Sequence, residues 1–390
     1  MAGYCITRNL FSSVLKTPRV FVFRNELPFR VQVSTSSLKS KPPSILLLTV
    51  AGVGAGAILG GGYSFYSINK GNSPISNDGV GATSSVIQNF PGVSVSRRVF
   101  NEADASGLHL TLFQYPTCPF CCKVRAFLNF YGISYDVVEV DPVLRQQIGW
   151  SNYKKVPILL AKVENGYQQL NDSSMIISAL ASYLQESQPN LSEIVKCYPS
   201  MSYRDDNGDE KSEIMNRYFL MLHGQFTGQT KEEMEEERKW RKWADNTLVH
   251  TLSPNVYRTK EEALQAFEWF SEVGEWDRLF PSWERNLIVY AGAYAMLFIG
   301  KRLKKRHNLK DNVRLSLYDE CNNWMRNLKK KNSTFLGGKQ PNLGDLAVYG
   351  VLSSIEGCIA FEDLLKNTSI GSWYWPMKKL VQSNMGIVIS

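Results

Sequence analysis

Two cysteines, Cys118 and Cys121, are the residues of this chain best suited to chemistry. They lie in the stretch YPTCPFC, which begins at Tyr115. Cys118 would lie at a helix N-terminus if a helix begins at Pro119, where the missing N–H of proline is no loss. Unpaired N–H groups and the helix dipole favour a thiolate there. Cys121 would lie one turn deeper, as a resolving thiol. The pair therefore predicts thiol chemistry.

The same pair has two other interpretations, half of a zinc site or two structural core cysteines. Zinc needs four ligands, usually from a second close pair. The other cysteines of the chain stand singly, apart from Cys122, which follows the pair directly. We therefore expect no metal site, while the structural interpretation stays open. Seven cysteines in 390 residues do not make a disulfide scaffold, and we expect an exposed thiol pair to work in a reducing compartment.

The elements around the pair must place it at a turn between a strand and a helix. We expect a buried strand over 108–115 and a helix whose apolar stripe recurs every three or four residues up to Tyr131. Further strands are expected over 134–140, 156–160 and 168–170, with a short helix over 142–149. A helix should begin at Asp172-Ser173. This order, β-α-β-α-β-β-α, predicts an α/β thioredoxin-like domain over residues 108–190.

The second half of the chain has a helical pattern. After a loop-rich connection over 191–230, helices are expected almost throughout 231–385, which makes an all-α domain. Asn342–Asp345 has the spacing of a capping box before an apolar helix. Residues 286–300 carry no charge but are short for a membrane span, so we expect a buried core helix. The basic cluster 301–307 is expected to be a solvated helix end, with contact to anionic lipid or an acidic ligand left open.

The N-terminal region has a different composition. Residues 1–43 carry +6 of the net charge of +8, which is typical of a mitochondrial-type presequence or of the basic flank of an anchor. Residues 44–67 contain no charged residue and are long enough to cross a bilayer, so one membrane helix is expected. A polar linker should follow over 68–107. The rest of the chain carries only +2, so we expect no nucleic-acid partner.

A thioredoxin-like domain followed by a helical domain resembles the glutathione transferase superfamily. Val156-Pro157 matches the proline, normally cis, at the edge of that family's active site. Asp172-Ser173 matches the acid-serine pair that holds the γ-glutamyl end of glutathione at a helix N-terminus, where free N–H groups favour a carboxylate. Asn342–Asp345 matches the N-capping box of the second domain. The resemblance therefore implies the glutathione transferase architecture and glutathione as cofactor.

Longer strings, among them KVPILL, WADNTLVH and PNLGDLAVYGVL, closely resemble the microsomal prostaglandin E synthases of type 2 over residues 108–375. This resemblance implies isomerisation of the lipid endoperoxide prostaglandin H2 to prostaglandin E2. It implies that Cys118 is the catalytic thiol, with Tyr115 and Cys121 beside it. The residues that it implies for glutathione binding are Phe120, Val156, Pro157, Asp172 and Ser173.

The resemblance has further implications. The resemblance allows haem as a second cofactor, bound through the glutathione sulfur. His250 is then a candidate neighbour of the haem, and the alternative is that His250 is a core histidine. It implies a homodimer at a membrane, with the Golgi membrane as location. The basic N-terminus favours a mitochondrial location instead, and N-terminal cleavage would release a soluble cytoplasmic form.

Two other functions fit the same residues. A glutaredoxin-like thiol–disulfide oxidoreductase would need both Cys118 and Cys121. A glutathione- or haem-binding protein without physiological isomerase activity would need neither thiol for catalysis.

Overall fold

The computed structural model describes residues 86–389, except 143, 187–189, 205–209 and 222–228. The expected basic segment over 1–43 and the expected membrane helix over 44–67 lie outside the described residues. Within the described part, none of the helices combines the length and the apolar character needed to cross a bilayer.

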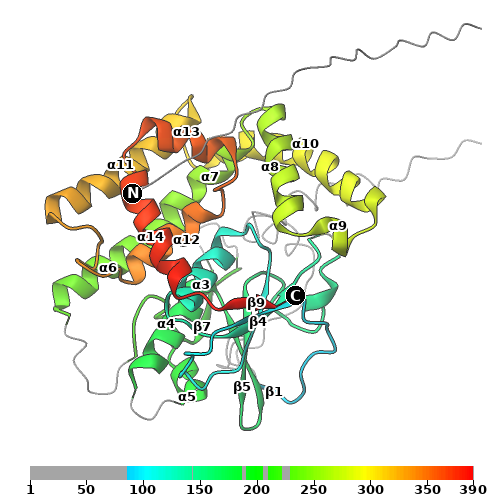
Figure 1. The fold of residues 1–390 in the computed structure, drawn as a ribbon, viewed down its shortest axis with the longest axis vertical. Coiled ribbons are helices and arrows are strands. Elements are labelled where there is room, and N and C mark those ends of the chain that lie inside the picture. Colours follow the sequence, from blue (N-terminus) through cyan, green and yellow to red (C-terminus); the bar gives the residue numbers. More distant parts are fainter. Residues whose placement is uncertain (1–85, 143, 187–189, 205–209, 222–228, 390) are drawn as a thin grey trace, which may run out of the picture. The chain divides into compact units, whose positions relative to one another are not determined.

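The N-terminal domain is built on one seven-stranded sheet, with the strand order β1-β6-β5-β3-β4-β2-β9 (Figure 1). The pair β3–β4 is parallel and the other pairs are antiparallel. The helix between β3 and β4 makes the crossover that a parallel pair requires. The strands are β1 (Val86–Ile87), β2 (Arg97–Phe100), β3 (Leu110–Gln114), β4 (Tyr135–Glu139), β5 (Ile158–Val163), β6 (Gly166–Asn171) and β9 (Ile387–Ile389).

The two faces of this sheet are covered differently, because successive side chains of a strand point to opposite faces. Leu112 of β3 packs with the helices α3 (Pro119–Phe130) and α4 (Ser173–Gln185). Its neighbour Phe113 packs on the other face, with the cysteine pair and the short 3-10 helix η2 (Gln146–Ile148). The expected order of strands and helices in this domain is present. The expected helix over 142–149 is only the single turn η2.

Three strands lie outside the range that the sequence assigned to the domain. β1 and β2 fall in the expected linker over 68–107, and β9 follows the expected last helical residue, 385. β2 pairs through its backbone with β4 on one side and with β9 on the other, and this pairing joins both strands to the sheet. Backbone pairing of short strands leaves little trace in the side-chain pattern, so the polar composition suggested a linker.

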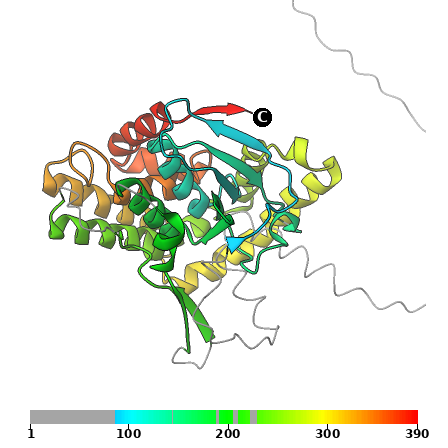
Figure 2. The same cartoon turned by 90° about the horizontal axis from the view of Figure 1, so that it is seen from below.

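The connection over 191–230 contains the helix α5 (Leu191–Lys196) and the hairpin of β7 (Ser200–Arg204) and β8 (Glu210–Ile214). Figure 2 shows this hairpin projecting away from the seven-stranded sheet. The helices that follow are α6 (Lys231–Trp243), the π-helical turn η3 (Ala244–Leu248), α7 (Val249–Val256), α8 (Lys260–Val273), α9 (Trp276–Leu279), α10 (Ser282–Arg306), α11 (Val313–Lys331), α12 (Leu343–Ser353), α13 (Ile359–Asn367) and α14 (Gly371–Ser383).

The two domains meet along α3 and α12. Gly350 of α12 lies so close to α3 that a Cβ atom there would be 2.5 Å from the Cα of Lys123. α12 begins with the expected capping box: Asn342 accepts from the N–H of Asp345, and the Asp345 carboxylate accepts from the N–H of Asn342. The helix that carries the domain contact is therefore fixed at its start by its own sequence.

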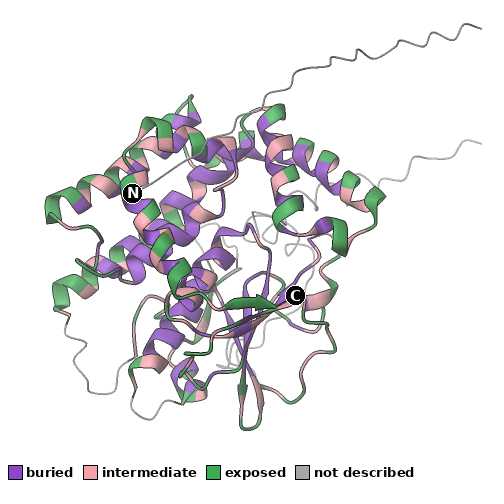
Figure 3. Ribbon diagram, in the orientation of Figure 1, coloured by how far each residue is buried: buried purple, intermediate pink, exposed green. Residues whose placement is uncertain are grey.

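The uncharged stretch 286–300 does not form the buried core helix that was expected. It is part of α10, which buries one face and exposes large apolar side chains on the other (Figure 3). The hydrophobic pattern of the sequence could not show which face of the helix is exposed, because both faces are apolar.

Candidate active site

Cys118 lies at the turn between β3 and α3, as the spacing predicts. It is the N-cap residue of α3, with extended backbone angles, and Pro119 is the first helical residue. The N–H of Cys118 donates to the carbonyl of Tyr115 at 3.2 Å, and its own carbonyl accepts from the N–H of Cys122 at 2.8 Å. Both Cys118 and Cys121 are fully buried, whereas an exposed pair was expected. The second layer of residues over this face of the sheet covers them.

The surroundings of the pair push its two pKa values in opposite directions. Burial raises the pKa of the Cys118 thiol, but hydrogen bonds from the Cys121 thiol and from the N–H groups of Cys121 and Phe120 outweigh it. The net result is a pKa for Cys118 below the ordinary value of 9.0. Burial and the neighbouring Cys118 raise the pKa of Cys121 well above that value. Of the two thiols, Cys118 therefore loses its proton more readily, and Cys121 is the hydrogen-bond donor to it.

Arg125 places a permanent positive charge on the inner side of the pair. Its guanidinium donates to the side chain of Gln114, to the carbonyl of Pro116 and to the Cys122 sulfur, at 2.5, 2.5 and 3.1 Å. The charge lowers the pKa of Cys118 further. These bonds also fix the loop from Gln114 to Cys118, so the thiol is held in place by its surroundings.

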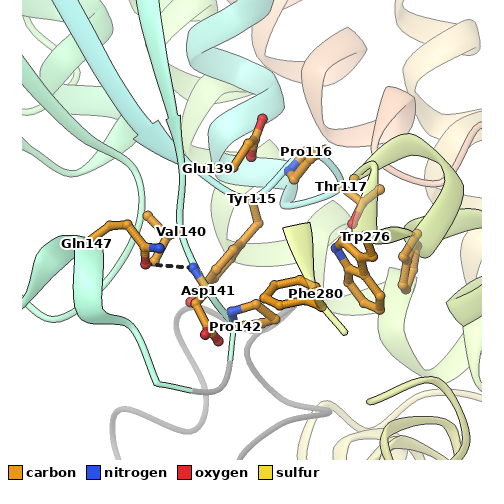
Figure 4. A pocket seen from close by; sticks show the side chains of 12 residues that line it. Tyr115, Pro116, Thr117, Glu139, Val140, Asp141, Pro142, Gln147, Trp276 and Phe280 are labelled. Atoms are coloured by element: carbon orange, nitrogen blue, oxygen red, sulfur yellow. Dashed lines mark hydrogen bonds between the residues drawn. The ribbon is translucent and has the colours of Figure 1, made fainter. Parts of the chain in front are cut away.

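Tyr115 points from this loop into a cavity of about 80 Å³ between the two domains. Figure 4 shows its side chain directed toward Asp141 and Pro142, with Trp276 and Phe280 of the helical domain also lining the cavity. Burial raises the pKa of Tyr115 above its ordinary value, so the phenol keeps its proton. The cavity is smaller than the roughly 300–1,000 Å³ of typical small-molecule sites. The cysteines themselves do not line it.

The expected glutathione residues come from three places: the loop before β5, the start of α4 and the start of α3. The Val156–Pro157 peptide bond is cis, and Val156 packs in the cluster that holds both thiols. Asp172 caps α4 by accepting from the N–H groups of Ser174 and Met175 at 2.9 and 3.1 Å. Ser173 is buried. Phe120 supplies a backbone N–H to Cys118, and its ring packs against the same cluster.

Sequence reasoning missed two residues that contact Asp172 at the α4 N-terminus, Tyr153 and Arg217. The hydroxyl of Tyr153 is hydrogen bonded to the backbone of Asp172, and the charges of Asp172 and Cys121 act on it. Burial raises its pKa above the ordinary value. Arg217 donates to the Asp172 carboxylate at 3.3 Å. Neither residue stands in a short motif, so no local signal marks them.

A buried ion pair supports the site from the helical domain. Lys123 of α3 pairs with Asp245 of η3, and its ammonium also donates to the hydroxyls of Ser173 and Ser174 at 3.1 and 2.9 Å. Asp245 accepts from Tyr218 at 3.0 Å. The network fixes the start of α4 relative to the helical domain.

His250 does not join this group. Its ring stacks on that of His307, with 4.0 Å between ring centroids. Burial, together with the charges of His307 and Arg306, lowers the pKa of His250 to about 4. Among the described residues, no group of three or more histidine, cysteine or acidic side chains is arranged to hold a metal ion. The structure therefore brings together Tyr115, Cys118, Cys121 and Val156, and leaves His250 apart from them.

A comparison with known protein families agrees with the arrangement of strands and helix around Cys118. A family model described as Glutaredoxin matches residues 110–163, which span β3, α3, β4 and β5. Glutathione transferase F7 from Populus trichocarpa is 13% identical, with a TM-score of 0.39 over 71% of this chain and all of that one. Glutaredoxin 2 from Salmonella typhimurium, solved in complex with glutathione, is 15% identical with a TM-score of 0.35, covering 71% and 99%. Both likenesses are distant.

The fold and the site thus define a thioredoxin-like, glutathione transferase-like protein: an α/β domain with a thiol at the start of its helix α3, followed by a helical region. Two relatives give the particular family. Prostaglandin E synthase 2 of Danio rerio is 48% identical over 288 residues, which cover 72% of this chain and 74% of that protein. Prostaglandin E synthase 2 of Mus musculus is 49% identical over 281 residues, covering 71% and 72%. The chain belongs to the prostaglandin E synthase 2 family, a family of enzymes.

Proposed function

We propose that this protein isomerises prostaglandin H2 to prostaglandin E2, with Cys118 as the catalytic thiol. The observation that carries the proposal is the position of Cys118 at the N-terminus of α3, where the Cys121 thiol and two backbone N–H groups donate to its sulfur and lower its pKa. A lower thiol pKa increases the fraction of Cys118 that can act as a base near neutral pH.

The reaction needs no outside oxidant or reductant. The Cys118 thiolate takes the proton from the endoperoxide carbon that becomes the ketone. The electron pair of that C–H bond forms the carbon–oxygen π bond, and the O–O bond breaks. The other oxygen leaves with the bonding pair and takes up a proton as it becomes the hydroxyl. Tyr115, which keeps its proton because burial raises its pKa, is the donor at that oxygen. Its position in the cavity supports this role (Figure 4).

Glutathione fits the residues around the α4 N-terminus. The Asp172 carboxylate is placed for the amino group of the tripeptide, and Ser173 begins a helix whose N-terminus favours a carboxylate. The backbone at Val156 is available to the cysteinyl unit, as in the transferases that the sequence resembles. If bound, glutathione would supply a further thiol to the site. The cavity next to Tyr115 is too small for a prostaglandin, and Cys118 is buried outside its lining. Binding of the substrate therefore requires both the lining side chains and the residues that cover Cys118 to move.

His250, the expected neighbour of haem, is stacked on His307 and does not line the cavity beside Tyr115, so this residue gives no support to a haem site there. We assign no step to haem.

We also propose that residues 44–67 anchor the chain in a membrane and that the folded part forms a homodimer. The absence of charge over 44–67 supports the anchor. The family resemblance favours the Golgi membrane, and the basic residues of 1–43 make the mitochondrion the alternative. Microscopy of the tagged full chain, with and without residues 1–43, separates the two locations.

The test is product analysis with prostaglandin H2 on the full chain. Cys118→Ser should lower the rate of prostaglandin E2 formation by about 10²–10⁴-fold, the usual contribution of a positioned general base. Tyr115→Phe should also lower it. Cys121→Ser should keep part of the activity, because Cys121 only tunes Cys118.

The second candidate, a glutaredoxin-like oxidoreductase, is favoured by the direct hydrogen bond between the two thiols. It predicts that Cys121→Ser abolishes reduction of a mixed disulfide substrate by glutathione. Full prostaglandin E2 formation by Cys118→Ser, together with loss of disulfide reduction, would replace the isomerase proposal with this one.

A further inference from the structure

Helix α10 exposes a line of large apolar side chains. They follow one another at spacings of four, three, four and four residues, which puts them on one face of a helix. Trp283 at the start and Phe298 at the end are 69% and 68% exposed, and α10 lies at the edge of the helical region in Figure 3. We call these five residues the α10 stripe: Trp283, Leu287, Tyr290, Tyr294 and Phe298.

The opposite face of α10 is already packed against the rest of the helical domain. Rotation of the helix therefore cannot bury the stripe. Ile288, Ala293 and Met296 are buried, and α10 packs along α7 and α8. Gly292 lies against the Phe267 ring, where a Cβ atom would be 2.5 Å from the ring. A surface helix normally keeps charged and polar residues on its outer face. The outer face of α10 thus carries large apolar side chains where charged and polar ones are usual.

Positive charge continues the same line. Lys301 and Lys305 follow Phe298 at three and seven residues, so they extend the stripe, and Arg302 and Arg306 flank them. All four are exposed. Lys260 of α8 adds a further charge, 5.5 Å from the Tyr294 ring. Residues 286–306 contain no acidic residue. An apolar and aromatic face that ends in lysines and arginines is the composition of a helix that lies in a membrane interface.

We propose that α10 docks on an anionic membrane surface, lying in the interface with the stripe toward the lipid and the basic end against the headgroups. Charge complementarity selects this occupant, because basic side chains are attracted to anionic lipid. A second copy of α10 is less complementary, since it brings the same basic end and a single acidic residue, Glu284. The proposal needs neither residues 44–67 nor the proposed activity.

The start of α10 is close in sequence to a residue that lines the cavity beside Tyr115. Phe280, which lines that cavity, is separated from the start of α10 by a single residue. This point rests on the proposed function: a lipid endoperoxide dissolved in the membrane would meet the enzyme at the side of the molecule where the cavity lies.

The test measures hydroxyl-radical oxidation of individual side chains in the full chain on vesicles. One vesicle is phosphatidylcholine alone and the other contains added phosphatidylserine. The predicted anchor can hold the chain on both, and the basic residues 1–43 can strengthen binding to the anionic one, so docking of α10 is judged from the oxidation of its own side chains. Oxidation of Trp283, Tyr290 and Phe298 should fall by about fivefold or more on the anionic vesicles, as expected when even one basic side chain meets the surface. Leu315 of α11, which is 46% exposed, should not change.

Two variants sharpen the result. Lys301→Gln combined with Lys305→Gln should remove most of the protection, because together they weaken docking by roughly an order of magnitude. Phe298→Glu should do the same, while the matched control Leu315→Glu should leave the protection intact. Circular dichroism checks that each variant is folded.

Equal oxidation of the stripe on the two vesicles would overturn the proposal. Protection that appears without vesicles and grows with protein concentration would overturn it in favour of a second copy. Cys118→Ser, which removes the proposed chemistry, should leave the protection unchanged, so failure of docking and failure of the isomerase proposal are seen separately.

Discussion

Lys123 and Asp245 form an ion pair that joins the two domains, with side chains only 1% and 10% exposed. Lys123 lies on α3, five residues after Cys118, and Asp245 lies in the π-helical turn between α6 and α7. Ser173 and Ser174 accept from the same ammonium group. The position of the thiol helix, of the expected glutathione residue Ser173 and of the helical domain therefore depends on one buried charge pair.

Removal of one partner should destabilise the protein strongly. We expect Lys123→Met or Asp245→Asn to cost about 3–5 kcal/mol, because each leaves an uncompensated buried group. Denaturant unfolding of the full chain measures this. The double variant Lys123→Met with Asp245→Leu is the control, and it should recover part of the loss. Additive losses in the double variant would show that the two residues are not coupled.

The same pair makes stability depend on acid. Burial raises the pKa of Asp245, but the charge and hydrogen bond of Lys123 outweigh it, so the folded-state pKa lies below the ordinary value of 3.8. A depressed carboxyl pKa contributes stability that is present above pH 3.8 and is lost as the pH falls through the folded-state value. Asp245→Asn should show a smaller loss of stability in this acid range. The prediction is wrong if the unfolding midpoint of Asp245→Asn falls with pH as steeply as that of the original chain.

The thiol titration should respond to Cys121. Its hydrogen bond is one of the interactions that lower the pKa of Cys118, so Cys121→Ala should raise the pH at which the Cys118 thiolate appears. Ultraviolet thiolate absorbance against pH is the measurement. Cys122→Ser is the control, because burial raises the pKa of Cys122 and its thiol adds no thiolate in the same range. A curve unmoved by Cys121→Ala would mean that the helix N-terminus alone holds the thiolate.

Gly350→Ala should disturb the contact between the domains. The new Cβ would lie 2.5 Å from the Lys123 Cα and 2.7 Å from its backbone N, and backbone atoms cannot yield as a side chain does. We expect a loss of about 1–3 kcal/mol, the usual range for an overpacked interface. Unfolding by urea measures it, and Gly92→Ala is the control because nothing lies within 4 Å of a Cβ there. Equal stability of the two variants would contradict the close approach.

The stacked histidines should weaken the fold in mild acid. Burial and the charges of His307 and Arg306 lower the pKa of His250 from 6.5 to about 4. The unfolded chain then takes up the proton first, so stability falls as the pH drops from about 6.5 toward 4. His250→Gln should flatten this part of the profile of melting temperature against pH. A profile as steep as that of the original chain would place the acid-sensitive group elsewhere.

The sequence by itself determined the features that depend on neighbouring residues. The strand, the turn and Pro119 placed Cys118 at the start of a helix, the Asp172 cap opened α4, and Asn342 with Asp345 opened α12. Each is a local preference of backbone and side chain, and a few residues suffice to express it. The order of elements in the first domain follows from the same kind of pattern.

Only the tertiary structure decided which distant groups meet. Asp245 and Tyr153 carry no local signal, because their partners at Lys123 and Asp172 are brought near by packing. The burial of Cys118 and Cys121 depends on a second layer over the sheet, and β9 joins β2 through backbone bonds that side-chain patterns do not record. The uncharged residues of α10 could indicate an apolar helix, but which of its faces finds a partner is decided by what packs against it.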